Sequence, residues 1–463
     1  MADMSSDVST DSQPKSLSPR TDQHPADEGH PADEGQTPAL RLPTSRGCPF
    51  DPSPEYKRLQ DEDPVSRLAF PDGSDGWLLS RYEDVRSLLA DPRTSSKFGF
   101  GLNPVRELPP EAQEELMQVR PGQFIRMDPP EHTRYRRLLT GQFTVRRMNA
   151  LTPRIEQIVA DHLDAMGKMA RPVDLVENFA LPVPSLVICE LLGVPYTDRD
   201  LFQRLSRALL SMTTDGPTLV RVRGELMQYM LDLVRAKRLQ PGDDLLSGLI
   251  AREDPEGALT DEELVSIGNL LLIAGHETTA NMLALGTLAL LEHPAQLAAL
   301  RADPSMIDRA VEELLRYLTI VQFGVVRTTA EDVEVGGRCI RAGQPVVASL
   351  AAANRDPQQF PDPDLLDLSR QYSPHLAFGH GVHQCLGQQL ARVEMKVGFT
   401  AVLERFPTLR LAVPLDQVRM RDDMFIYGVH ELPVTWDDDG AVGEPKPSTM
   451  ESNCSATSRA NEP

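Results

Sequence analysis

The chain has 463 residues, of which 40% are hydrophobic and 25% are charged, so it can bury a sizeable core and is not disordered as a whole. Its 68 acidic residues outnumber the 47 basic ones, and the net charge of −21 argues against binding to nucleic acid or to an anionic membrane. The five cysteines are scattered and form neither a disulfide framework nor a zinc-ligand pattern, which favours a reducing cytoplasm.

Both ends of the chain have the composition of disordered tails. Residues 1–45 are rich in Ser, Asp, Pro and Gly, and they repeat the hexapeptide His-Pro-Ala-Asp-Glu-Gly at 24–29 and 30–35. Such a segment cannot bury enough apolar surface to fold, and it lacks the basic and apolar run of a signal peptide. We therefore expect disordered tails at 1–45 and 437–463, and one folded domain over 46–436.

Apolar residues at helical spacing predict a mainly α protein with minor β structure. After a strand at 77–82, helices are expected at 83–89, 153–168, 197–213 and 218–238. The longest helix begins at Thr260, which is placed to form a capping box with Glu263, and ends at His293-Pro294. At about 48 Å this helix is as long as a whole domain is wide, so we expect it to run through the centre of the protein.

The second half of the chain contains the expected β structure. Helices are predicted at 308–318 and 386–406, β-rich segments at 325–326, 333–335 and 344–349, and a hairpin at 424–435 around Gly428. The most apolar stretch of the chain, 264–291, is interrupted by polar and charged residues. It is therefore not expected to span a membrane, and we expect a soluble protein.

The most informative segment is 378–387, Phe-Gly-His-Gly-Val-His-Gln-Cys-Leu-Gly, in which glycines surround Cys385 just before a helix. A thiolate at a helix N-terminus is stabilised by the helix dipole and by free backbone N–H groups. Such a thiolate could be a nucleophile, a metal ligand or a haem ligand. A nucleophile needs a His and Asp or Asn relay, which the turn between His383 and Cys385 does not provide, and zinc needs further ligands at suitable spacing.

This segment resembles the haem-binding signature of the cytochrome P450 superfamily, Phe-Gly-x-Gly-x-His-x-Cys-x-Gly. The resemblance covers about residues 46–436. It implies the cytochrome P450 fold, with haem b between the long central helix and the Cys-bearing loop. It further implies that Cys385 is the axial iron ligand, and that Phe378, Gly379 and Gly387 shape the cofactor site, with Phe378 packed against the thiolate.

The long helix contains Ala274-Gly-His-Glu-Thr278, which resembles the family's Ala-Gly-x-(Asp/Glu)-Thr oxygen-activation motif. Small residues at 274 and 275 open a gap beside the helix, and a threonine bonded to the i−4 carbonyl can bend it there. Dioxygen fits such a gap, where Thr278 would donate a hydrogen bond and Glu277 would relay protons through water. From the residues alone, two other interpretations remain open. The small residues could form a packing groove for another helix, and the alcohol could be Thr279 instead of Thr278.

Glu313 and Arg316 lie three residues apart on the predicted 308–318 helix, where a surface salt bridge is the ordinary interpretation. The resemblance instead implies the family's buried Glu-x-x-Arg pair. Arg370, before the haem loop, stands where the third partner of that pair is expected. We therefore expect Glu313, Arg316 and Arg370 to form a structural cluster.

The resemblance also implies a set of donors for the two haem propionates. His132 and Arg136 are spaced i,i+4 after Asp128-Pro-Pro, and Arg327 and His383 match the other family positions. A buried carboxylate needs charge-assisted hydrogen bonds of this kind.

The activity that the resemblance implies is monooxygenation: insertion of one oxygen atom from O2 into a hydrophobic small molecule, by hydroxylation or epoxidation. Finer features look like the soluble actinobacterial branch active in antibiotic biosynthesis and xenobiotic oxidation. Oxidative coupling on the same haem-thiolate, or a non-enzymatic haem sensor, is the alternative. Residues 93–124, rich in Gly and Pro, are a candidate lid. The expected apolar pocket consists of Leu270, Ile273, Ala274, Phe323, Val325, Phe425 and Ile426.

The chain has no flavin or nicotinamide fingerprint, so its electrons must come from other proteins. The resemblance implies a ferredoxin and an NAD(P)H-dependent ferredoxin reductase. An acidic ferredoxin needs a basic docking surface. Arginines are dense between Arg126 and Arg147, and Arg392 and Lys396 follow Cys385 on the next helix, so we expect a basic patch there.

Overall fold

The computed structural model of the chain describes residues 39–437, except 100–101, 108, 110–112, 115–117 and 372–373. The two expected tails therefore lie almost entirely outside the described residues. Leu40 and Leu42 nevertheless pack on the folded domain: Leu40 forms a β-bridge with Leu68, and Leu42 is buried. The folded domain thus begins a few residues before position 46.

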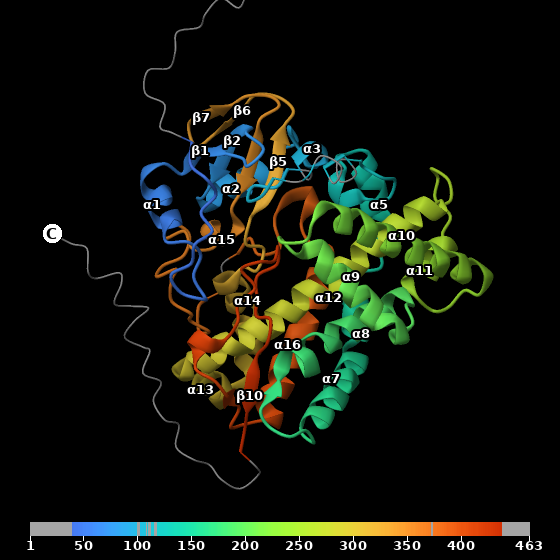
Figure 1. Cartoon of the computed structure of the whole chain (residues 1–463), viewed down its shortest axis with the longest axis vertical. Coiled ribbons are helices and arrows are strands. Elements are labelled where there is room, and N and C mark those ends of the chain that lie inside the picture. The colour runs from blue at the N-terminus through green and yellow to red at the C-terminus, as the bar shows by residue number, and fades with distance from the viewer. Residues whose placement is uncertain are drawn as a thin grey trace, which may run out of the picture. The chain divides into compact units, whose positions relative to one another are not determined.

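The longest helix, α12 (Asp261–Glu292), contains 32 residues and runs through the middle of the helical part of the domain (Figure 1). It begins as predicted, because the Thr260 hydroxyl accepts from the Glu263 N–H and the Glu263 carboxylate accepts from the Thr260 N–H. It ends at His293, and Pro294 begins the next helix. Helices that pack against α12 include α8 (Pro182–Leu192), α10 (Gly216–Leu239), α14 (Ile307–Leu318) and α16 (Gln388–Arg405), and most residues of α12 are buried.

The helices predicted at 83–89, 153–168, 197–213, 218–238, 308–318 and 386–406 are all present, with their ends shifted by a few residues. The remaining α-helices are α1 (Glu55–Glu62), α2 (Tyr82–Ala90), α3 (Ser96–Gly99), α5 (Glu131–Thr140), α6 (Val145–Ala150), α7 (Thr152–Met166), α9 (Arg199–Leu210), α11 (Leu245–Ile250), α13 (Pro294–Ala302) and α15 (Leu350–Ala353). Short 3-10 or π turns are η1 (Phe124–Arg126), η2 (Val176–Ala180), η3 (Tyr196–Asp198), η4 (Pro304–Met306), η5 (Gly381–His383) and η6 (Leu415–Gln417).

The β structure is minor and lies mostly to one side of the helices (Figure 1). A five-stranded sheet has the order β1-β2-β8-β5-β3, in which only β2 and β8 run parallel. A three-stranded sheet has the order β4-β10-β9, and β6 pairs with β7. The strands are β1 (Val65–Ala69), β2 (Asp75–Leu79), β3 (Thr94–Ser95), β4 (Val173–Asp174), β5 (Val325–Thr329), β6 (Val333–Val335), β7 (Arg338–Ile340), β8 (Pro345–Ala348), β9 (Arg410–Leu411) and β10 (Pro433–Thr435).

The prediction of a hairpin at 424–435 is wrong. The chain instead folds back earlier, so that the Arg421 N–H donates to the Gly428 carbonyl, while β10 pairs with β4 and β9. Gly428 does not serve as a hairpin turn. It lies directly against α12, where a Cβ atom would overlap the Asn281 amide. The glycine is therefore explained by close packing rather than by turn geometry.

No single helix in the described parts of the chain is long and apolar enough to cross a membrane. Joined together, α12 and α13 would reach that length and composition, but the two helices meet at an angle of 102°.

Candidate active site

A cavity of about 610 Å³ brings the two main sequence motifs together. Ala274, Gly275 and Thr278 of α12 line part of its wall, and Cys385 and Gly387 line another part. The helix motif and the cysteine loop, distant in the sequence, therefore face the same space.

The cysteine loop owes its path to glycine. Gly379 and Gly381 have φ angles of 68° and 74°, in the left-handed region that favours glycine. A Cβ atom on Gly381 would also overlap the carbonyl oxygen of Leu89 in α2. The Cys385 N–H donates to the Phe378 carbonyl at 2.9 Å, so the loop closes on itself just before α16 begins.

The chemistry of Cys385 follows from where this loop ends. Burial raises the pKa of the Cys385 thiol, while backbone N–H groups of Gly387 and Gln388 and the nearby Arg136 act to lower it. A cationic metal centre at the sulfur would further favour the thiolate. Within the described parts of the chain, no group of three or more His, Cys, Asp or Glu side chains could hold a metal ion. A zinc-type site is therefore not assembled from the described residues.

The helix motif shapes the cavity wall as the sequence predicts. The Thr278 hydroxyl donates to the Ala274 carbonyl at 2.8 Å and lines the cavity, as does Thr279. Gly275 lets α8 approach closely, because a Cβ atom there would lie 2.7 Å from a terminal carbon of Ile188. The small residues therefore border the cavity, and Gly275 also accommodates the neighbouring helix, which was the alternative interpretation of the motif.

Glu277 lies next to Thr278 but is held by a residue that the sequence did not indicate. Its carboxylate pairs with Arg421 Nη2 at 3.1 Å, and Arg421 Nη1 donates to Asn281 Oδ1 at the same distance. Glu277 is buried and does not line the cavity. No motif marks Arg421, because it approaches α12 only through the fold of the C-terminal segment.

Four cationic or imidazole side chains gather at one end of the site. The rings of His132 and His383 lie 4.2 Å apart between centroids, and Arg136 and Arg327 line the cavity together with His383. Burial lowers the pKa of Arg327 to about 10, and burial followed by the charge of Arg327 lowers the pKa of His383 to about 3. Crowded donors whose charged forms are disfavoured make this end of the cavity suited to anions.

The cluster of Glu313, Arg316 and Arg370 is assembled. Glu313 accepts from Arg316 Nε and Nη2, each at 2.8 Å, and from Arg370 Nε at 3.2 Å. Arg316 also donates to backbone carbonyls, including that of Asn354 at 2.9 Å. Both Glu313 and Arg316 are buried, so this is not a surface salt bridge.

Most of the expected pocket residues line the cavity: Leu270, Ala274, Phe323, Val325 and Phe425. Ile273 and Ile426 do not, and those two predictions are wrong. Ile273 precedes Ala274, so it is turned by about 100° around the helix. Ile426 is buried and forms an isolated β-bridge with Val321 instead.

Several cavity residues were missed because only the tertiary structure brings them there. They come from η1, α8, α9 and the segment after α9: Phe124, Ile188, Leu209 and Met212. The candidate lid 93–124 lies partly outside the described residues. Its described part contributes six residues to the cavity: Leu102, Asn103, Pro104, Arg106, Gln123 and Phe124.

Comparison with known proteins agrees with this geometry. The family model for cytochrome P450 matches residues 212–434. Cytochrome P450-SU2 of Streptomyces griseolus is 48% identical over 86% of this chain and 97% of its own length, and pentalenic acid synthase of Streptomyces avermitilis is 46% identical over 86% and 97%. The crystal structure of CYP105P1 in complex with filipin I has a TM-score of 0.81 at 45% identity, covering 86% of this chain and 99% of that one. The chain is a cytochrome P450.

This P450 is therefore a haem-thiolate monooxygenase, and its cofactor is haem b with an axial cysteine thiolate. The residues on the cavity wall fit that group. His132 Nε2 is buried and has no partner among the described residues, as expected of a donor reserved for a carboxylate. Together with Arg136, Arg327 and His383 it would meet the two propionates, and Cys385 would meet the iron.

The basic patch expected on this P450 is largely neutralised. Arg126 is only 1% exposed, and Arg137 pairs with Asp254 and Glu256, each at 3.1 Å. Arg134 pairs with Asp254 at 3.0 Å and also contacts Glu263. Arg392 pairs with Glu312 at 2.6 Å and Lys396 pairs with Asp308 at 2.9 Å. The exposed arginines that remain are Arg146 and Arg147 on α6.

Proposed function

We propose that this P450 inserts one oxygen atom from O2 into a hydrophobic small molecule, with Cys385 as the iron ligand. The observation that carries the proposal is the single cavity that joins Cys385 to Ala274 and Thr278. When bound there, haem supplies the oxygen activation and transfer. The protein's own part is to orient substrate, exclude water and direct protons.

In this proposal Thr278 and Glu277 manage the protons. The Thr278 hydroxyl lies at the cavity wall, where it donates to the Ala274 carbonyl, and after rotation it would present its proton to the cavity instead. Glu277 is one residue away, and the ion pair of its Oε2 atom with Arg421 fixes the carboxylate from which protons would be relayed through water. Arg421 would thus set how readily Glu277 takes part.

The substrate class follows from the cavity lining. Most of its wall is built from apolar side chains, including Leu270, Phe323 and Phe425. A few polar side chains, such as Gln123 and Arg106, could orient a functional group of the substrate. The names of its relatives support a natural product: one is a pentalenic acid synthase, and one related structure holds filipin I. We therefore propose a bulky, mainly hydrophobic natural product or xenobiotic, hydroxylated or epoxidised.

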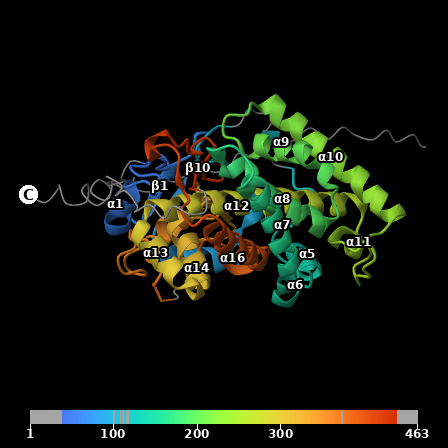
Figure 2. The same ribbon diagram turned by 90° about the horizontal axis from the view of Figure 1, so that it is seen from below.

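We further propose that a ferredoxin and its reductase deliver the electrons in the cytoplasm. The sequence contains no flavin or nicotinamide fingerprint. Figure 2 shows α6, which carries Arg146 and Arg147, on the same side of α12 as the Cys-following helix α16. A donor that docks against α6 would therefore approach the sulfur side of the site.

Replacement of the proposed ligand tests the assignment. Cys385→Ser should abolish the red-shifted Soret band of the ferrous–CO thiolate complex, whereas serine variants of the other four cysteines, Cys48, Cys189, Cys339 and Cys454, should keep it. Loss of the band in one of the other variants, with retention in Cys385→Ser, would overturn the assignment.

Turnover separates monooxygenation from its alternatives. Ligands should first be screened for a low-to-high-spin shift of the haem. With NADPH, ferredoxin and reductase, a bound ligand should then yield a product that carries one added oxygen atom from ¹⁸O2. A coupled product without that atom would favour oxidative coupling, and a spectral change without product would favour a sensor.

A further inference from the structure

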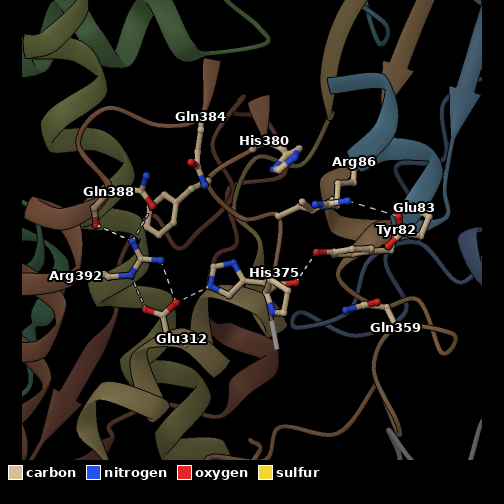
Figure 3. A pocket seen from close by; sticks show the side chains of 14 residues that line it. Tyr82, Glu83, Arg86, Glu312, Gln359, His375, His380, Gln384, Gln388 and Arg392 are labelled. Atoms are coloured by element: carbon tan, nitrogen blue, oxygen red, sulfur yellow. Dashed lines mark hydrogen bonds and ion pairs between the residues drawn. The ribbon is translucent and has the colours of Figure 1, made fainter. Parts of the chain in front are cut away.

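A second cavity, of about 490 Å³, is lined in part by the cysteine loop (Figure 3). Its lining is mostly polar, unlike that of the first cavity. Phe378, Gly379 and His380 line both cavities, so this short segment forms the partition between them. The position of Phe378 therefore decides how far the second cavity is separated from Cys385.

Three charged or polar side chains of the second cavity are joined in a row. In Figure 3, dashed lines connect Arg392 to Glu312 and Glu312 to His375. Arg392 donates to both carboxylate oxygens of Glu312, from Nε at 2.6 Å and from Nη2 at 3.0 Å. The Nε2 atom of His375 lies 3.1 Å from Glu312 Oε2. The Ala377 N–H donates to His375 Nδ1 at 3.2 Å, so Nε2 carries the proton and donates to Glu312.

The neighbours of Glu312 in this row also stabilise its negative charge. Burial on its own would raise the pKa of Glu312, but the hydrogen bonds from His375 and Arg392 hold it at about 2. Glu312 is therefore a carboxylate at every pH at which the enzyme would work. Two parallel N–H···O bonds to a carboxylate fix the plane of a guanidinium.

That plane covers the partition. The Arg392 guanidinium carbon lies 4.6 Å from the centroid of the Phe378 ring, and the His375 ring lies 6.1 Å from it. Arg392 Nη1 donates to Gln388 at 3.0 Å, so the remaining end of the guanidinium is fixed too. The Phe378 backbone is tied to Cys385 by the 2.9 Å hydrogen bond, which links this arrangement to the sulfur.

We propose that Glu312, Arg392 and His375 are positioning residues that hold the Phe378 ring in the partition and thereby keep water away from the Cys385 thiolate. This inference rests on the proposed function, because it takes Cys385 as the iron ligand. Glu312 comes from α14 and Arg392 from α16, so two helices that meet only in the folded domain set the environment of the ligand.

A simpler role would be to join α14 to α16, and the chain offers a matched control for it. Lys396 lies one turn after Arg392 and pairs with Asp308 of α14 at 2.9 Å. That pair joins the same two helices but neither residue lines the second cavity. Asp308→Asn therefore removes an α14–α16 ion pair without touching the row that covers Phe378.

The readout is the rate at which the ferrous–CO complex loses its red-shifted Soret band at constant temperature, measured on the holoenzyme. Glu312→Gln and Arg392→Lys should each accelerate the loss about threefold to tenfold, the effect expected from one cation–π contact. Arg392→Lys keeps the charge but cannot form the planar, two-bonded stack, so charge alone should not rescue it. Asp308→Asn should change the rate little.

A double variant isolates the link to Phe378. In a Phe378→Leu background, Glu312→Gln should accelerate the loss much less than it does in the wild type. Any of three results would overturn the inference: equal acceleration by Asp308→Asn, a wild-type rate of band loss in Arg392→Lys, or additive effects in the double variant. A wild-type holoenzyme without a red-shifted band would overturn the proposed ligand itself, and this inference with it.

Discussion

Arg421 and Glu277 are 144 residues apart in sequence, yet Arg421 Nη2 donates to Glu277 Oε2 at 3.1 Å next to the oxygen-activation motif. The same guanidinium donates to Asn281 one turn further along α12. The side chains of Arg421 and Glu277 are 9% and 3% exposed. The C-terminal segment therefore supplies the counter-charge for the acid that stands beside Thr278.

Removal of Arg421 should cost stability. Arg421→Met leaves the buried Glu277 carboxylate unpaired, and breaking such a pair typically costs about 3–5 kcal/mol. We expect a loss of that size in the free energy of unfolding of the holoenzyme, measured by urea denaturation. The double variant Glu277→Gln/Arg421→Met removes both charges and should recover much of the loss. Equal stability of the single and double variants would show that the ion pair carries little energy.

The central helix and the motif residues could be predicted because their signals are local. The Thr260–Glu263 capping box, the proline after His293 and the i,i+4 geometry of Ala274 and Thr278 depend on residues close in sequence. The contact of Glu313 with Arg370 spans 57 residues and was indicated only by resemblance to a family.

The residues that the sequence analysis missed or misinterpreted have one cause in common: their partners come from distant parts of the chain. Arg421 has no local signature, and Gly428 looks like a turn residue although it is explained by its packing on Asn281. Arginines that look like a docking patch in the sequence, such as Arg137, meet acids of the segment before α12. Charge counts in a sequence window cannot include partners that the fold brings in.

Thr278→Ala should uncouple oxygen consumption from product formation. The hydroxyl lies at the cavity wall and would act on oxygen after it binds, so haem content and the substrate-induced spin shift should change little. We expect product per NADPH to fall about tenfold, the effect of one hydrogen bond to a charged group, with hydrogen peroxide rising in its place.

Thr279→Ala is the matched control, because Thr279 also lines the cavity and stands one residue away. Product per NADPH should stay near the wild-type value in this variant. The reverse result, uncoupling in Thr279→Ala alone, would assign the role to Thr279.

Glu394 on α16 should make stability fall as pH rises. It is 1% exposed, its Oε2 atom has no partner among the described residues, and burial raises its pKa well above the usual 4.5. The folded protein therefore keeps a proton that the unfolded chain releases, so stability declines above about pH 4.5, by up to about 1.4 kcal/mol per pH unit. Glu394→Gln should remove this decline, so its stability relative to the wild type should rise between about pH 5 and about pH 7.

Chemical denaturation across that pH range measures the effect. Glu404→Gln, at an exposed position on the same helix, removes one carboxyl without the burial and should show no such pH-dependent gain. A constant difference between Glu394→Gln and the wild type at all pH values would mean that Glu394 titrates alike in the folded and unfolded states.

The last prediction concerns the electron donor. Of the arginines expected to attract an acidic ferredoxin, Arg146 stays exposed on α6, whereas Arg137 is already paired with acids. Arg146→Glu should therefore slow reduction by ferredoxin several-fold at low salt, mainly by lowering the association rate. Added salt should also slow reduction of the wild type, because charges are screened within about 8 Å at physiological ionic strength.

Arg235→Glu is the matched control. It makes the same charge change on α10, which lies across α12 from α6 (Figure 2), and it should leave the reduction rate near that of the wild type. Reduction by dithionite should be the same in all three proteins. Equal slowing by Arg146→Glu and Arg235→Glu would mean that net charge, rather than a docking surface on α6, governs the encounter.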